Sequence, residues 1–144
     1  MRKNTKVVDP RFSKGKGDYE KVIFSIEKEG KCPFCPDNFR YHKHPVLKRR
    51  GDWFITKSSW PYLNARLHLV LIKNSHKESV RELNVNDMKD ILFLVKWASG
   101  EFKISGGGLA MRFGKTAHTG ATVCHIHAHL IVPKRRKSVS FPIG

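Results

Sequence analysis

Three histidines alternate with apolar residues near the end of the chain, in the run His125-Ile126-His127-Ala128-His129. Successive side chains of a β-strand point to opposite faces, so the three imidazoles should project from one face, with neighbours about 6–7 Å apart. Each imidazole carries a hydrogen-bond donor and an acceptor, and burying it without partners is costly. The row therefore indicates a functional site, either a metal site or one for nucleophilic chemistry.

Attack on phosphorus is the nucleophilic chemistry that suits such a row. A histidine forms a covalent intermediate when one ring nitrogen is unprotonated and the other is held by an acceptor that fixes the tautomer. Neighbouring histidines and backbone N–H groups can then stabilise the charge on the phosphoryl oxygens.

A second set of reactive side chains lies in Cys32-Pro33-Phe34-Cys35, which has the spacing of a metal knuckle. A closed tetrahedral site needs two more ligands. His42 and His44 follow closely and could complete a local site, while a redox role is a further alternative without a thioredoxin-like context. With Cys124 read as a small buried apolar residue, the cysteines suit a reducing compartment, and we expect a cytoplasmic protein.

The elements that position these residues are expected to form an α+β fold, an antiparallel sheet of about five strands with one main helix. Asn84 and Asp87 predict the capped start of a helix over 85–102, whose apolar residues recur at helical spacing. Residues 37–45 look like a loop. Strands are expected at 22–26, 46–47, 53–56, 67–72, 109–113 and 124–132, with 46–56 as a hairpin.

Length and composition predict one domain with a basic surface. Residues 1–20 look like a flexible basic arm, and 21–144 like a single domain. No apolar run approaches the roughly 20 residues that span a bilayer, and no signal peptide is evident, so we expect no membrane association. The net charge of +16 favours phosphate-bearing partners such as a nucleotide or a nucleic acid.

Four blocks together resemble the histidine-triad (HIT) superfamily. His125 to Ile131 is similar to its signature His-φ-His-φ-His-φ-φ, where φ is apolar, and Thr119 to Val123 is similar to its Ala-Gly-Gln-Ser-Val segment. Pro61-Tyr62 and the block from Leu67 to His76 resemble a further conserved region. The Cys32–Cys35 knuckle resembles that of the zinc-bearing branches, which include galactose-1-phosphate uridylyltransferases and diadenosine-polyphosphate enzymes.

This resemblance implies a HIT-like fold, a homodimer and a division of labour among the histidines. His127 would be the nucleophile that forms a nucleotidyl-histidine intermediate, and His129 would bind the phosphate. Thr122 stands where the family has a serine that contacts the phosphate or the leaving group. A structural zinc ion would be held by Cys32, Cys35, His76 and His125.

Several positions depart from the family pattern. Arg112 replaces an asparagine and could clamp a phosphate through its planar fork, and Lys115 is a weaker candidate for the same task. Ala121 takes the place of a glutamine in the nucleotide-binding segment. Lys57 or Ser58 stands where a ribose-binding acid or amide is expected. Trp53, Trp60 and Tyr62 could stack on a base, but we expect them to serve packing.

Two functional hypotheses follow. The first is an enzyme, a hydrolase or nucleotidyltransferase acting on a phosphoanhydride, a phosphoramidate or a dinucleoside polyphosphate. The second is a zinc-containing basic module that binds nucleotides or nucleic acid through phosphate contacts without efficient turnover.

Overall fold

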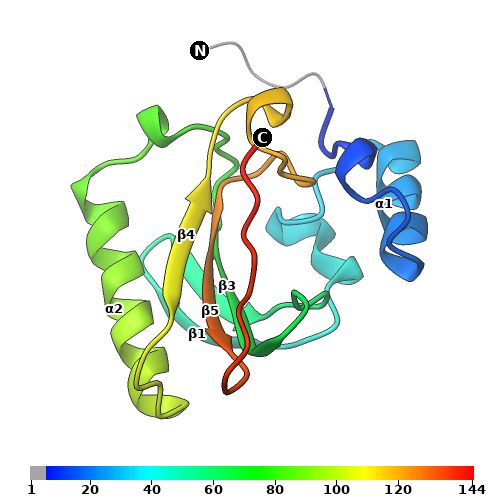
Figure 1. The fold of residues 1–144 in the computed structure, drawn as a ribbon. Coiled ribbons are helices and arrows are strands. Elements are labelled where there is room, and N and C mark those ends of the chain that lie inside the picture. Colours follow the sequence, from blue (N-terminus) through cyan, green and yellow to red (C-terminus); the bar gives the residue numbers. More distant parts are fainter. Residues whose placement is uncertain (1–5) are drawn as a thin grey trace.

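In the computed structural model, which describes residues 6–144, five antiparallel strands form one open sheet in the order β1-β2-β3-β5-β4. Two α-helices and four short 3-10 helices surround it (Figure 1). The strands are β1 Val46–Arg50, β2 Trp53–Lys57, β3 Ala65–Lys73, β4 Gly108–Arg112 and β5 His127–Pro133, and the helices are α1 Asp18–Glu29 and α2 Val85–Glu101. The expected α+β fold with an antiparallel sheet is confirmed.

The helix α2 covers one face of the sheet, as the sequence predicts. Its capping box is formed as expected, with Asn84 accepting from the backbone N–H of Asp87 and Asp87 accepting from that of Asn84. The face of α2 that meets the sheet is apolar, and the main core consists of Trp53, Ile55, Leu69, Leu71, Ile91, Leu94, Ala98, Ile126, Ala128 and Leu130. The hairpin β1–β2 and the buried strand β3 are also confirmed.

The opposite face of the sheet carries the triad. In the β3–β5 ladder Val70 pairs with His129 and Ile72 with His127, so the histidines share a face with these valine and isoleucine side chains. The alternate residues point to α2. This division follows from the period of two that the sequence shows, and it places His127 and His129 away from the main core.

The helix α1 corrects the strand expected at residues 22–26. The apolar residues Val22, Ile23 and Ile26 lie on the inner side of the helix, spaced for a helix rather than for an alternating strand. Gly30 ends the helix in the left-handed conformation. A run rich in β-branched and aromatic residues suggested a strand, but packing against Val8 and Val123 favours the helix.

Three other expectations are refined. The loop expected at 37–45 contains the 3-10 helix Pro36–Tyr41, and β5 begins at His127 rather than at Cys124. Part of the predicted arm, residues 1–5, lies outside the described residues; within the rest, Val8 and Ser13 are buried. The boundary at residue 20 stays a prediction. No helix in the described part of the chain is both long and apolar enough to cross a membrane.

Candidate functional site

A pocket of about 790 Å³ opens on the triad face of the sheet. Ligand pockets commonly have volumes of about 300–1,000 Å³, so it can hold a molecule of the size of a nucleotide. Side chains of α1 and the knuckle residue Phe34 provide apolar walls, while His68, His127, His129 and Arg112 provide polar ones. The geometry therefore places an apolar compartment beside a row of imidazoles.

His127 is held in a single tautomer by its own strand. Its Nδ1 lies 2.7 Å from the backbone carbonyl oxygen of His125. Because a carbonyl can only accept, Nδ1 carries the proton and Nε2 keeps its lone pair. Burial lowers the pKa of His127 to about 4, so the ring is neutral at pH 7. The ring is thus an unprotonated nitrogen nucleophile at the wall of the pocket.

His129 is oriented by a chain of hydrogen bonds that begins at the backbone of Tyr62. The N–H of Tyr62 donates to His68 Nδ1 at 3.1 Å, which places the proton of His68 on Nε2. His68 Nε2 then donates to His129 Nδ1 at 2.9 Å, so His129 carries its proton on Nε2. That Nε2 is buried and has no partner among the described residues. A buried donor without a partner is costly, which suggests that a ligand oxygen takes that place.

His68 is a site residue whose role could not be predicted from the sequence pattern. Burial lowers the pKa of His68 to about 4 and lowers the pKa of His129 well below its ordinary value, so both rings stay neutral. The two residues are 61 positions apart in the chain. A histidine inside an otherwise apolar strand was the one available signal, because such a ring needs a polar partner.

Arg112 lies on the triad face, as its proposed role requires. It pairs directly with His127 in the β4–β5 ladder, so the two side chains point to the same side of the sheet. The positive charge of Arg112 contributes, after burial, to lowering the pKa of both His68 and His127. Its NH1 donates to the hydroxyl of Tyr62 at 3.1 Å.

The C-terminal segment, residues 138–144, runs over this face, where Figure 1 shows it alongside β5. Two nitrogens of Arg112 donate to the carbonyl oxygen of Pro142, at 2.8 and 2.6 Å. The guanidinium also lies 3.8 Å from the ring centroid of Phe141, whose ring contacts His129. The predicted phosphate clamp is therefore engaged by the segment in this structure, a contact that the sequence pattern does not predict.

The four predicted metal ligands come together. Ligand atoms of Cys32, Cys35, His76 and His125 all lie within 4.8 Å of one another. His125 Nδ1 is 3.3 Å from Cys32 Sγ, 3.7 Å from Cys35 Sγ and 3.2 Å from His76 Nδ1. A tetrahedral zinc ion with bonds of about 2.3 Å to sulfur and 2.0–2.1 Å to nitrogen separates its ligands by roughly 3.4–3.8 Å, so the cluster nearly has the required size.

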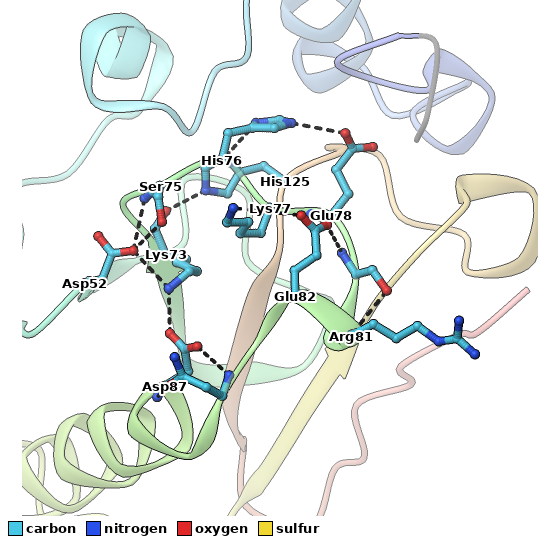
Figure 2. Close-up of polar contacts among 12 residues, drawn as sticks. Asp52, Lys73, Ser75, His76, Lys77, Glu78, Arg81, Glu82, Asp87 and His125 are labelled. Atoms are coloured by element: carbon cyan, nitrogen blue, oxygen red, sulfur yellow. Dashed lines mark hydrogen bonds and ion pairs between the residues drawn. The ribbon is translucent and has the colours of Figure 1, made fainter. Parts of the chain in front are cut away.

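The outer nitrogens of both histidines are fixed, as Figure 2 shows. His125 Nε2 donates to the carbonyl oxygen of Lys73 at 2.5 Å, and His76 Nε2 donates to Glu78 at 3.2 Å. Both protons therefore point outward, and both Nδ1 lone pairs point into the cluster. Burial raises the pKa of Cys32 to about 12, so a thiolate there needs a compensating cation. The donor set fits a divalent metal.

The candidate metal cluster lies next to a buried ion pair. Lys73, whose carbonyl orients His125, extends its ammonium group to Asp87 at 2.5 Å and to Asp52 at 2.9 Å. Trp53 also donates to Asp87, at 2.9 Å. Because Asp87 caps α2, this network, part of which is drawn in Figure 2, links the start of the helix to the end of β3.

The remaining candidate residues differ in whether they reach the pocket or the metal cluster. Thr122 and Ala121 line the pocket, whereas Lys115 is exposed and does not. His42 hydrogen-bonds to Thr56 and Ser59 rather than to a cysteine, and the candidate metal cluster does not include it or His44.

The remaining expectations concern aromatic residues and the third cysteine. Trp53 is a core residue, as expected, but Trp60 and Tyr62 line the pocket. Cys124 is buried, as expected.

No protein-family model matches the chain, and no curated protein matches it in sequence. Solved structures do match. A histidine triad nucleotide-binding protein from Candida albicans superposes with a TM-score of 0.62 at 22% identity, covering 79% of this chain and 82% of its own. For a HIT family hydrolase from Clostridium thermocellum the TM-score is 0.56 at 24% identity, with 75% and 95% covered. The chain has the histidine-triad fold.

Another solved structure that matches the chain is a diadenosine triphosphate hydrolase from Plasmodium falciparum. It has a TM-score of 0.52 at 22% identity, covering 67% of this chain and 65% of its own. These likenesses establish the arrangement of the sheet, and the residues of the pocket carry the argument about chemistry.

The hydrogen-bond chain through His68 can be tested by nuclear magnetic resonance of the imidazole nitrogens. We predict that His68 is neutral at pH 6 with its proton on Nε2, and that it titrates near 4 instead of 6.5. A folded-state pKa below the unfolded value means that the unfolded chain binds the extra proton, so stability falls as the pH drops from about 6.5 toward 4. A charged His68 at pH 6 would contradict the chain of donors.

Proposed function

We propose that the protein is a nucleotidyl hydrolase or transferase of the histidine-triad type, acting on a phosphoanhydride, a phosphoramidate or a dinucleoside polyphosphate. The observation that carries the proposal is the pairing of opposite roles on adjacent rings. His127 presents an unprotonated Nε2, and His129, whose ring centroid is 4.9 Å away, presents an unpartnered Nε2–H. A nucleophile beside a buried donor is what attack on a phosphoryl group requires.

The proposed reaction has two steps. The lone pair of His127 Nε2 attacks the phosphorus, a P–N bond forms, and the bond to the leaving group breaks with its electron pair, which takes up a proton. Water or another acceptor then attacks the nucleotidyl-histidine, the P–N bond breaks, and the acceptor loses a proton. The carbonyl of His125 stabilises the positive charge on the ring through the Nδ1 proton.

Other residues of the pocket fit supporting roles. His129 Nε2–H would donate to a phosphoryl oxygen, and the hydroxyl of Thr122 can contact the phosphate or the leaving group. Arg112 can exchange the carbonyl of Pro142 for a phosphate, which is the stronger partner because it is charged and can offer a separate oxygen to each of the two N–H groups. Ala121 leaves space beside them, and Lys115 stays a weaker candidate.

Zinc is the metal we propose for Cys32, Cys35, His76 and His125, since two thiolates and two imidazoles at tetrahedral distances suit it. All four zinc positions are protein ligands, so the metal is structural. Bound there, it fixes the ring of His125, whose carbonyl in turn fixes the tautomer of His127.

A homodimer completes the proposal. The strand β4 is an edge of the sheet, and its residue Leu109 is 51% exposed. Exposed edges pair readily with a second copy. Sedimentation equilibrium should give about twice the chain mass of 16.6 kDa, and Leu109→Lys should shift the protein toward the monomer. A monomer at every concentration contradicts this part of the proposal.

The cytoplasmic location stays a prediction.

One prediction concerns the proposed nucleophile. His127→Ala should lower kcat for an adenosine 5′-phosphoramidate by about 10⁴-fold or more, as removal of a nucleophile does in other covalent enzymes. The matched control is His118→Ala, at an exposed histidine outside the pocket, which should retain activity. Undiminished turnover by the His127 variant refutes the mechanism. Binding of nucleotides without turnover by the wild type would instead support the nucleotide-binding alternative.

Another prediction concerns the proposed zinc site. Elemental analysis of protein purified without chelators should give about one zinc per chain. Cys32→Ser should lose most of that zinc, because a hydroxyl is a poor ligand for it, and should unfold at a lower temperature. Cys124→Ser, at the buried cysteine outside the cluster, should keep its zinc. Equal zinc contents of the two variants would rule out the assigned ligands.

A further inference from the structure

The pocket has an unusual electrostatic character. Among the described residues that line it, none is Asp or Glu, while Lys16 and Arg112 are cationic and the histidines are neutral. A ribose-binding carboxylate would repel any additional phosphate on the sugar, but of the two residues at the position where the resemblance implies an acid or amide, Lys57 and Ser58, only Ser58 lines the pocket. Among these lining residues, no acidic side chain therefore opposes a second negative charge.

Ser58 offers a donor to such a ligand. Its Oγ accepts from the N–H of Trp60 at 3.2 Å, so the hydroxyl hydrogen is the group it can donate. Ser58 begins a wall of the pocket that continues through Trp60 to Tyr62, whose ring is stacked 5.6 Å from that of His129.

Two lysines lie beside aromatic rings of the pocket wall, Lys16 among the lining residues and Lys43 next to them. The rings of Trp60 and Tyr19 lie 5.4 Å apart, with Lys43 Nζ 3.7 Å from the centroid of Trp60 and Lys16 Nζ 6.0 Å from that of Tyr19. Among residues 6–144 neither lysine forms an ion pair. Both side chains are long and exposed, so they can turn toward an anion with little loss of packing.

We propose that the pocket accepts a nucleotidyl group whose ribose carries a second phosphate. The 5′-phosphate would lie at His127 and His129, and the second phosphate at Ser58, Lys43 and Lys16. A nucleoside 3′,5′-bisphosphate and the 5′ end of an oligonucleotide share this chemistry. The inference rests on the proposed function, because it places the reacting phosphate at the triad.

The test compares binding of three probes by calorimetry at low salt: a nucleoside 5′-monophosphate, the 3′,5′-bisphosphate and the 5′-phosphorylated dinucleotide, in adenine and cytosine series. Two contacts with exposed lysines should make the bisphosphate bind about three- to tenfold more tightly than the monophosphate. A similar gain for the dinucleotide identifies an oligonucleotide ligand, and a gain for the bisphosphate alone identifies a phosphate monoester.

The decisive variant is Lys16→Ala/Lys43→Ala. It should abolish the gain and leave monophosphate affinity within about twofold, whereas the control Lys48→Ala/Lys96→Ala removes the same charge from exposed lysines that do not line the pocket and should keep the gain. Equal affinities of wild type for all probes, or a gain that survives the first variant, overturns this inference while leaving the proposed function intact. Absence of both monophosphate binding and turnover overturns both.

Discussion

The direction of the protons on the buried imidazoles is the constraint on which the candidate site depends. A buried neutral histidine has one donor and one acceptor, and the partner of one nitrogen decides what the other can do. At His127 a carbonyl holds the proton on Nδ1, and at His129 the chain from Tyr62 through His68 holds it on Nε2. The neighbouring rings on β5 therefore differ at Nε2, where His127 has a lone pair and His129 has a proton to donate.

The same constraint connects the candidate metal cluster to His127, the proposed nucleophile. The ring of His125 is fixed on one side by Lys73 and on the other by the cluster, while its carbonyl holds His127. Lys73 is itself anchored by the acid that caps α2. An ion in the cluster would therefore rigidify the strand at the residue that orients His127, the proposed nucleophile, without contacting the phosphate in the proposed reaction.

Much of the fold and of the candidate site could be predicted from the local sequence. Alternation placed His127 and His129 on one face, and the pair Asn84 and Asp87 gave the start of α2. The spacing of Cys32 and Cys35 indicated a metal knuckle, and resemblance to known proteins supplied the distant ligands His76 and His125. These signals are local or belong to shared motifs, so they survive in a single sequence.

The features that sequence could not give depend on contacts between distant segments. The strand expected at 22–26 is a helix because Val8 and Val123 pack against it. His68 acquires its role from a partner 61 residues away. The placement of residues 138–144 over Arg112 follows from the path of the chain after β5. Tertiary packing overrides local preference in each case.

The central claim is that His127 becomes covalently attached to the nucleotide. Its most direct test is mass spectrometry of wild-type protein mixed briefly with an adenosine 5′-phosphoramidate and quenched in alkali, where phosphorus–nitrogen bonds survive. The covalent mechanism predicts an adenylyl mass increment on the peptide that contains His127, absent from His127→Ala. Rapid turnover with no modified peptide, or an adduct on another residue, would contradict it.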